Sequence, residues 1–165
     1  MKSVGSIPEK IFTPETILPQ LKRWRLQNKK IVFTNGVFDI IHQGHLAVLS
    51  EAASLGHILL VGVNSDASVK RLKGESRPVN AEGSRALLLA ALVMTDGVIL
   101  FEEDTPLQLI QLILPDVLVK GGDYTSSQIV GAAEVKANGG EVRIVPLLAG
   151  HSTTELIQKM SASKK

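Results

Sequence analysis

The sequence predicts an α/β fold: a doubly wound, Rossmann-like parallel sheet of about five strands with helices on both faces. Runs of valine, isoleucine and leucine alternate along the chain with segments of helical periodicity. These runs are nearly continuous, as expected for strands that are covered on both faces of a parallel sheet. With 165 residues, 44% of them hydrophobic, the chain is expected to form a single domain, residues 1–165, with a proper core. Its ends, residues 1–13 and 161–165, are expected to be flexible.

Five short segments rich in β-branched residues are predicted to be the strands. Each is apolar along its whole length and is followed by a polar segment. The predicted strands cover residues 30–34, 58–63, 97–101, 116–120 and 141–146.

Helices are predicted before, between and after these strands. Thr105 followed by Pro106 reads as an N-cap with proline at the first helical position. Gly139 stands where a left-handed residue commonly ends a helix. The predicted helices cover residues 14–27, 46–55, 84–94, 106–114, 131–138 and 153–160.

Composition excludes several classes of protein. The absence of cysteine excludes disulfides and thiolate metal sites, and it fits a reducing cytoplasm. The apolar stretch "ALLLAALVM" is far shorter than the roughly 18 residues that span a bilayer, and "MKSVGSIPEK" has no apolar signal-peptide core. A net charge of +2 is too small to indicate nucleic acid. We therefore expect a cytoplasmic protein with neither a membrane nor a nucleic acid as its partner.

Four polar segments follow predicted strands, where open parallel sheets bind their ligands. They are "TNGVFD", "VNSD", "KGGDY" and "AGHSTT". We expect them to converge on one edge of the sheet and to supply nucleotide- or phosphate-binding residues. The candidates are Thr34, Asn35, Gly36, Val37, Asp39, Asn64, Asp66, Gly121 and Gly122.

His42 and His45 stand three positions apart around Gly44, at the predicted start of a helix. Positions i and i+3 share a helical face, so the two imidazoles can act on the same ligand. Zinc would need a third ligand, and only His57 and His151 remain as histidines. Gly44 lets a ligand approach the backbone, and a helix N-terminus favours anions. Phosphate is the favoured ligand, although a histidine at a helix start can also be only structural.

Three further features are candidates for phosphate binding, and each also has a structural explanation. "KRLKGESR" is a basic run that could clamp phosphate or simply face solvent. Lys120 ends an apolar strand before two glycines, where the backbone can pass close to a ligand. Ser152 and Glu155 form a capping box, which also leaves a helix N-terminus at the binding edge. Asp39 and Asp66 could contact a ribose, hold magnesium through water or cap a turn.

Common nucleotide and hydrolase signatures are absent. The chain has no G-x-x-x-x-G-K-[ST], no G-x-G-x-x-G and no G-x-S-x-G. The tail "KMSASKK" together with "HQGH" suggests a class I aminoacyl-tRNA synthetase, but the chain is too short for a synthetase core and a tRNA-binding domain. We reject that interpretation.

The chain resembles the cytidylyltransferase-like nucleotidyltransferases that carry H-x-G-H after a first strand. Within them it resembles the ADP-heptose synthase adenylyltransferases in particular. The segments that carry the resemblance are "TNGVFDIIHQGH", "LGHILLVGVNSDASVKRLKGESRPVN", "FEEDTPLQLI", "PDVLVKGGDYTSSQIVG" and "GHSTTELIQK". H-x-G-H alone is typical of the whole superfamily, whereas "VNSDASVKRLKG" together with "VLVKGGDY" is typical of a much narrower group of proteins.

The resemblance implies a reaction and a set of site residues. ATP and a heptose 1-phosphate would give ADP-heptose and pyrophosphate, with Mg²⁺ held mainly by the substrate phosphates. Catalytic roles are implied for His42, His45, Lys73 and Lys120. The residues implied to bind nucleotide or phosphate are Phe38, Gly44, Asp123, Ser152, Thr153 and Thr154, and Arg77 and Arg85 resemble the family's basic residues. A homodimer is also implied.

This sequence departs from the family pattern in three places. Val37 stands where many relatives have cysteine, which argues against a thiol role. "PLLAGHSTT" lacks the arginine that related cytidylyltransferases carry before their G-x-S-T segment, so Lys73, Lys120 or another arginine must compensate the phosphate charge. Many relatives also carry a fused sugar kinase domain, so a separate enzyme would have to make the sugar phosphate.

Two alternatives to the adenylyltransferase stay open. One is a cytidylyltransferase acting on glycerol 3-phosphate or a similar alcohol phosphate, because base choice cannot be read from spacing. The other is a nucleotide-binding module without catalysis. The sequence leaves the heptose anomer open as well.

Overall fold

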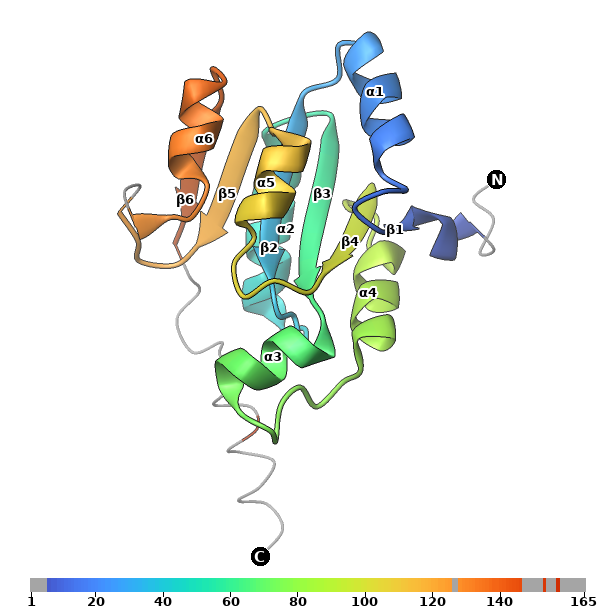
Figure 1. The fold of residues 1–165 in the computed structure, drawn as a ribbon, viewed down its shortest axis with the longest axis vertical. Helices are drawn as coiled ribbons and strands as arrows, with labels where there is room; N and C mark the ends of the chain where they lie inside the picture. The colour runs from blue at the N-terminus through green and yellow to red at the C-terminus, as the bar shows by residue number, and fades with distance from the viewer. Residues whose placement is uncertain (1–5, 126–127, 147–152, 154–156, 158–165) are drawn as a thin grey trace, which may run out of the picture.

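The computed structural model describes residues 6–125, 128–146, 153 and 157. Its described strands form one parallel sheet in the order β1-β4-β3-β2-β5-β6. Figure 1 shows this sheet with its helices packed around it. The strands are β1 (Ile11–Phe12), β2 (Ile31–Gly36), β3 (Ile58–Asn64), β4 (Gly97–Phe101), β5 (Val117–Gly121) and β6 (Glu141–Val145).

The predicted strands are confirmed, with ends that shift by at most two residues, because buried apolar runs identify central strands well. The prediction of about five strands missed β1. That strand has two residues, pairs only with β4 and lies half-buried at the edge of the sheet. So short an element leaves no periodic signal in the sequence.

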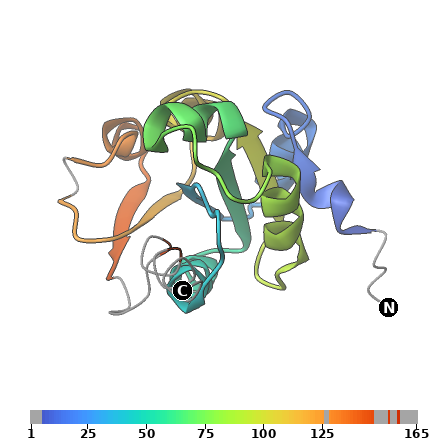
Figure 2. The ribbon, with the colours of Figure 1, turned by 90° about the horizontal axis from the view of Figure 1, so that it is seen from below.

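Helices cover both faces of the sheet, as Figure 2 shows in the view along its edge. On one face α1 (Leu18–Leu26), α5 (Leu107–Ile113) and α6 (Ala132–Ala137) pack against strand residues such as Phe33 and Leu60. On the other face α2 (Gln43–Ser54) and α4 (Glu82–Ala91) pack against residues such as Val32 and Val61. Neighbouring residues of β2 therefore belong to opposite cores, which confirms the doubly wound architecture.

One helix was not predicted. It is α3 (Asp66–Lys73), which follows β3 directly and begins at Ser65, whose hydroxyl accepts a hydrogen bond from the backbone N–H of Ser68. Val69 is its only fully buried apolar residue, so it lacks the broad apolar stripe that marks a helix against a core. A short 3₁₀ helix, η2 (Pro8–Lys10), was also missed.

Two capping predictions had different outcomes. Gly139 has a φ of 81° directly after the C-cap of α6, as predicted. The prediction that Thr105 is an N-cap was wrong, because Pro106 is the N-cap of α5 and the helix begins at Leu107. The predicted helix over residues 153–160 lies largely outside the described residues.

The order of the strands creates a switch point between β2 and β5. Strand β3 lies on one side of β2 and is reached through α2, whereas β5 lies on the other side and is reached through α5. Because α2 and α5 cover opposite faces, the loops after β2 and β5 diverge and leave a crevice at their carboxyl ends. No helix in the described part of the chain is long and apolar enough to cross a membrane.

Candidate functional site

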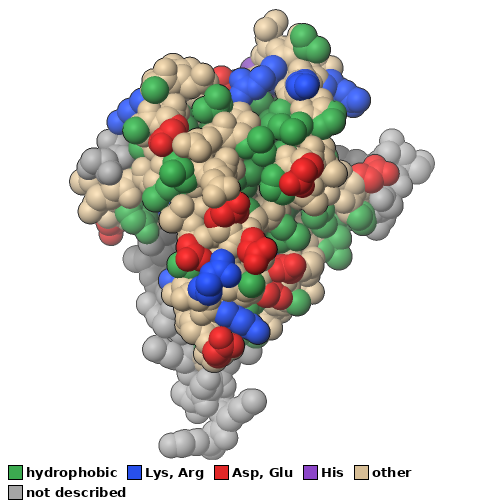
Figure 3. All heavy atoms as spheres, viewed as in Figure 1, with side chains coloured by type: hydrophobic (Ala, Val, Ile, Leu, Met, Phe, Trp, Pro, Cys, Tyr) green, Lys and Arg blue, Asp and Glu red, His purple; other side chains and the backbone are tan. Residues whose placement is uncertain are grey.

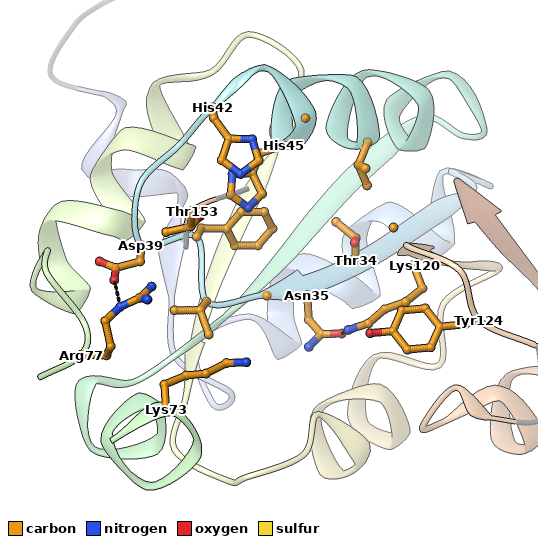
Figure 4. A pocket seen from close by; sticks show the side chains of 16 residues that line it. Thr34, Asn35, Asp39, His42, His45, Lys73, Arg77, Lys120, Tyr124 and Thr153 are labelled. Carbon is orange, nitrogen blue, oxygen red and sulfur yellow. Dashed lines mark hydrogen bonds and ion pairs between the residues drawn. The ribbon is translucent and has the colours of Figure 1, made fainter. Parts of the chain in front are cut away.

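A cavity of about 390 Å³ opens at the switch point between β2 and β5. Figure 4 shows its walls, which come from the exits of β2 and β5, the start of α2 and the end of α3. Fourteen of the residues predicted to bind substrate line it: Thr34, Asn35, Gly36, Val37, Phe38, Asp39, His42, Gly44, His45, Lys73, Arg77, Lys120, Gly121 and Thr153. Two other lining residues, Val48 and Tyr124, were not predicted.

The imidazoles of His42 and His45 are stacked, with their ring centroids 3.9 Å apart and their planes at 28°. His42 is the N-cap of α2 in an extended conformation, and His45 lies in the first turn. Both rings therefore lie beside the positive end of a 12-residue helix. Two nitrogen-bearing rings and free helix N–H groups at one place form an arrangement suited to an anion with several oxygens.

His45 is uncharged near neutral pH in this structure. Burial, together with the neighbouring His42, lowers the pKa of His45 to about 4. A neutral imidazole still has one N–H to donate, and an incoming anion would shift the proton equilibrium back toward the imidazolium.

The ring of Phe38 packs against the imidazole of His45. The two rings lie 5.2 Å apart at a tilt of 55°, and Phe38 is 7% exposed. The backbone of Phe38 has a φ of 50°, a region that a bulky residue rarely adopts. The turn after β2 therefore holds backbone strain at the residue whose ring packs against His45.

Lys120 brings a cation to the other wall of the cavity. It stands at the carboxyl end of β5, and its Nζ donates to Oδ1 of Asn35 at 3.3 Å. Burial lowers the pKa of Lys120. In the described structure the hydrogen-bond contact of the Lys120 side chain is with this neutral amide and not with a carboxylate. A bound anion would therefore compensate the positive charge of Lys120.

The basic run "KRLKGESR" was interpreted either as a phosphate clamp or as a solvent-facing surface, and each interpretation holds for part of it. Lys73, at the end of α3, and Arg77 line the cavity. Arg71 instead pairs with Asp104 at 2.7 Å, and both side chains are exposed. Figure 3 shows basic and acidic side chains intermingled on this solvent-facing side of the molecule. One half of the run thus faces a ligand site and the other half is a solvated helix surface.

Asp39 lines the cavity but is already engaged by the protein. Its carboxylate, 1% exposed, accepts hydrogen bonds from Arg77 Nε at 2.7 Å and from the backbone N–H groups of Val79 and Asn80 at 2.8 and 2.9 Å. Burial alone would raise the pKa of Asp39, but these hydrogen bonds outweigh it and lower the pKa. Asp39 therefore connects the loop after α3 to the end of β2. Of the three roles considered for Asp39, this arrangement is closest to capping a turn.

Three further predicted residues lie behind the cavity wall. Arg85 is fully buried in α4 and donates to Asp66 Oδ1 at 2.7 Å and to the carbonyl of Val37 at 2.6 Å. The amide of Asn64 donates to Ser68 Oγ at 3.0 Å. None of Asn64, Asp66 and Arg85 lines the cavity. Arg85 contacts a residue that does, Val37, whereas the side-chain partners of Asn64 and Asp66 named here lie outside the lining.

The glycine pair Gly121 and Gly122 lies at the end of β5. Gly122 has a φ of 136°, and a Cβ on it would lie 2.6 Å from the ring of Tyr124, so only glycine fits there. Gly122 and the exposed Asp123 do not line the cavity, whereas Gly121 and Tyr124 do. A tyrosine three residues beyond the end of a strand carries no signal in a single sequence, which explains why Tyr124 was missed.

The capping-box region is described at one position. Thr153 lines the cavity, and its hydroxyl donates to the carbonyl of Ile40 at 3.4 Å. Ser152 and Thr154, which were predicted to cradle phosphates, lie outside the described residues.

The described residues contain no cluster of three or more His, Asp or Glu that could hold a metal ion. Both oxygens of Asp39, the acidic side chain in the cavity, accept hydrogen bonds from the protein. The described side chains therefore do not form a complete protein-only metal site.

Comparisons with known proteins show which family and which relatives the chain is similar to. Residues 33–159 match the cytidylyltransferase-like family. A bifunctional protein HldE from Rhodopseudomonas palustris is 58% identical over 146 residues, which are 88% of this chain and 30% of that protein. Another HldE, from Hyphomonas neptunium, is 55% identical over 150 residues, 91% of this chain and 31% of that protein. The chain spans about a third of the length of these curated relatives.

Two solved structures share the fold. The lipopolysaccharide core biosynthesis protein from Thermoplasma volcanium is 30% identical, with a TM-score of 0.60 over 73% of this chain and 97% of that one. A pantoate-beta-alanine ligase from Francisella tularensis has the same TM-score at 14% identity, covering 94% of this chain and 78% of that one. The second likeness concerns the fold alone.

Proposed function

The chain belongs to the cytidylyltransferase-like family of nucleotidyltransferases, and we propose that it transfers AMP from ATP to a heptose 1-phosphate. The products are ADP-heptose and pyrophosphate, for the synthesis of a lipopolysaccharide core precursor. The residues shared with the ADP-heptose synthase adenylyltransferases support this choice, as does the 30% identity to a lipopolysaccharide core biosynthesis protein.

The observation that carries the proposal is the meeting of four groups in one cavity. The stacked His42 and His45 lie at the start of α2, and Lys73 and Lys120 approach from the ends of α3 and β5. These donors come from three elements, α2, α3 and β5, and face the same space, as Figure 4 shows. Such an arrangement suits a polyphosphate, whose oxygens lie on several sides of the chain of phosphorus atoms.

The reaction needs alignment and charge stabilisation more than it needs a base. An oxygen of the sugar phosphate, anionic at neutral pH, attacks the α-phosphorus of ATP and forms the new P–O bond. The bond from the α-phosphorus to the oxygen bridging to the β-phosphate breaks, and its electron pair leaves with pyrophosphate. No proton has to be removed from the acceptor, so the protein contributes by positioning two repelling anions and by stabilising the charge that develops.

Each cationic or donor group has a part in this scheme. His42, His45 and the first turn of α2 bind the β- and γ-phosphates and stabilise the leaving pyrophosphate. Lys120 neutralises charge at the α-phosphate, where the acceptor also approaches. Lys73 adds charge compensation from the opposite wall, in place of the arginine that the segment "PLLAGHSTT" lacks.

We propose that Mg²⁺ enters with the nucleotide and is held mainly by its phosphates. Mg²⁺ commonly keeps several waters and binds substrate phosphates instead of a protein cage. When bound, it would lower the negative charge of the polyphosphate. The roles of the histidines and lysines given above do not depend on a protein ligand for this ion.

We further propose that the protein works in the cytoplasm as a homodimer, on a sugar phosphate made by a separate kinase. The dimer rests on the family resemblance and is tested by light scattering coupled to gel filtration. A monomeric mass at micromolar concentration, with full activity, would contradict it.

A pyrophosphate-release assay tests the main proposal. Purified protein is incubated with ATP, CTP, GTP or UTP and with both anomers of a heptose 1-phosphate, other sugar 1-phosphates or glycerol 3-phosphate. We expect release only with ATP and a heptose 1-phosphate. Release with CTP and glycerol 3-phosphate would identify the cytidylyltransferase alternative. ATP binding without release from any pair would identify a non-catalytic nucleotide-binding module.

A further inference from the structure

A second, smaller cavity of about 190 Å³ adjoins the first. It is lined by Pro106, Gln128, Ile129 and Val130, together with three residues that also line the larger cavity. The shared residues are Asn35, Lys120 and Tyr124. These three side chains thus form a common boundary between two compartments, and Figure 4 shows them grouped together.

The walls of the smaller cavity combine apolar surface with a few fixed polar groups. Pro106, Ile129 and Val130 supply the apolar part. Gln128 supplies an amide whose orientation is set by the protein, because the backbone N–H and the hydroxyl of Thr125 both donate to its Oε1 at 2.9 Å. Its Nε2 is then the amide group able to donate to a ligand. Such a wall suits a compact carbon skeleton that carries hydroxyl groups.

The position of the two compartments fits an in-line transfer. His42 and His45 lie across the larger cavity from Asn35, Lys120 and Tyr124 (Figure 4). If the leaving pyrophosphate binds at the histidines, the attacking oxygen must reach the α-phosphorus from the opposite side. The opposite side of the larger cavity is the boundary that contains Lys120. The smaller cavity lies beyond this boundary. Lys120 is then the cation at which the two anionic substrates meet.

We propose that the smaller cavity receives the sugar of the acceptor, and that Gln128 is a specificity-determining residue that donates a hydrogen bond to a sugar hydroxyl. This inference rests on the proposed function and identifies the part of the site that reads the acceptor. The volumes agree with this division. The larger cavity has a size typical of sites for nucleotide-sized ligands, and the smaller one lies below that range.

The first test replaces Gln128 by leucine, which keeps the approximate size of the side chain and removes the donor. We expect KM for heptose 1-phosphate to rise roughly three- to tenfold, the effect of losing one neutral hydrogen bond, with KM for ATP unchanged. Gln111→Leu is the matched control, since Gln111 is an exposed residue of α5 that does not line either cavity. It should leave both KM values unchanged.

The second test fills the cavity through Val130→Phe. Val130 is 41% exposed, so the larger ring can be accommodated without repacking the core, and circular dichroism with an ATP dissociation constant checks the fold. We expect KM for heptose 1-phosphate to rise about tenfold or more, while ATP binds as in the wild type. Val93→Phe, at a position that is 82% exposed and outside both cavities, is the control.

The outcomes separate this inference from the function it rests on. If the wild type releases no pyrophosphate with any acceptor, the proposed function fails and the sugar compartment fails with it. If the wild type is active and both variants keep wild-type KM values for heptose 1-phosphate, only the sugar compartment is overturned. A rise in KM for ATP alone would also overturn it, because the smaller cavity would then hold the adenine.

Discussion

The guanidinium of Arg85 donates a hydrogen bond to the carbonyl oxygen of Val37 at 2.6 Å, although the two residues are 48 positions apart. The same fully buried guanidinium donates to the carbonyl of Asn80 and to the carboxylate of Asp66. One cation therefore joins the turn after β2, the loop after α3 and the start of α3. Val37 precedes the strained Phe38, so Arg85 fixes the backbone next to the ring that Phe38 contributes to the cavity.

Arg85→Lys should destabilise the protein and loosen the cavity. An ammonium group keeps the charge but cannot reach three acceptors in the geometry of a guanidinium. We expect the free energy of unfolding in urea to fall by about 1.5–3 kcal/mol and KM for ATP to rise. Arg143→Lys is the control, because Arg143 is exposed and pairs only with the nearby Glu141 in the described structure. An unchanged KM for ATP in Arg85→Lys would contradict the positioning role.

Asp39→Asn should release the loop after α3. The amide cannot accept from Arg77 and from the two backbone N–H groups as a carboxylate does. We expect a loss of about 1.5–3 kcal/mol in the free energy of unfolding, measured by urea titration. Asp104→Asn breaks an exposed pair with Arg71 and should cost about 1 kcal/mol at most. Equal losses of unfolding free energy in the two variants would show that the buried Asp39–Arg77 pair stabilises the protein no more than the exposed Asp104–Arg71 pair.

His42→Ala and His45→Ala should each lower kcat by about 10²–10³-fold, as losing one transition-state donor commonly does. Steady-state pyrophosphate release measures the effect, and a thermal melt checks the fold. His57→Ala, at the opposite end of the sheet, should keep nearly normal turnover, because His57 does not line the cavity. Normal turnover by both cavity variants would refute the mechanism. About one equivalent of zinc in the purified protein, with activity lost on chelation, would replace it with a metal mechanism.

The stability of the ligand-free protein should fall as the pH is lowered from about 6.5 to about 4. The pKa of His45 is lowered from 6.5 to about 4 in the folded state, so between these values the unfolded chain binds more protons. Stability from the uncharged, partly buried ring is fully present above the unfolded pKa and is lost as the pH falls toward the folded pKa. His45→Gln should lose less stability than the wild type over this range, as measured by urea titration at fixed pH steps. Parallel curves for the two proteins would contradict this assignment.

The central fold could be predicted because its signals are local. Strands such as β3 are apolar over their full length, and Gly139 marks a helix end through its own backbone conformation. β1 and α3 could not be recognised, since β1 has two residues and α3 is held mainly by its cap and by polar contacts. Elements with little apolar burial are stabilised by neighbours that the sequence does not identify.

The site was predictable at the level of segments and less so at the level of single side chains. Parallel strands end at the same edge, so "TNGVFD" and "KGGDY" had to meet there, and their first residues line the cavity. The sequence could not distinguish Lys73, which faces the cavity, from Arg71, which faces solvent and pairs with Asp104. Nor could it show that Asp66 and Arg85 would pair with each other behind the wall. Those outcomes depend on the direction of α3, a helix that was not predicted.

Asn35 and Lys120 meet across a gap of 85 positions because β5 lies beside β2 in the sheet. During synthesis on the ribosome, β5 emerges only after β3, β4 and the returning helix α5 have been made. Until then the nascent chain has one wall of the cavity without the other. If ATP binds there as proposed, it stabilises the completed sheet but not a chain that lacks β5, and the central strand that is synthesised last is also the one that completes the binding site.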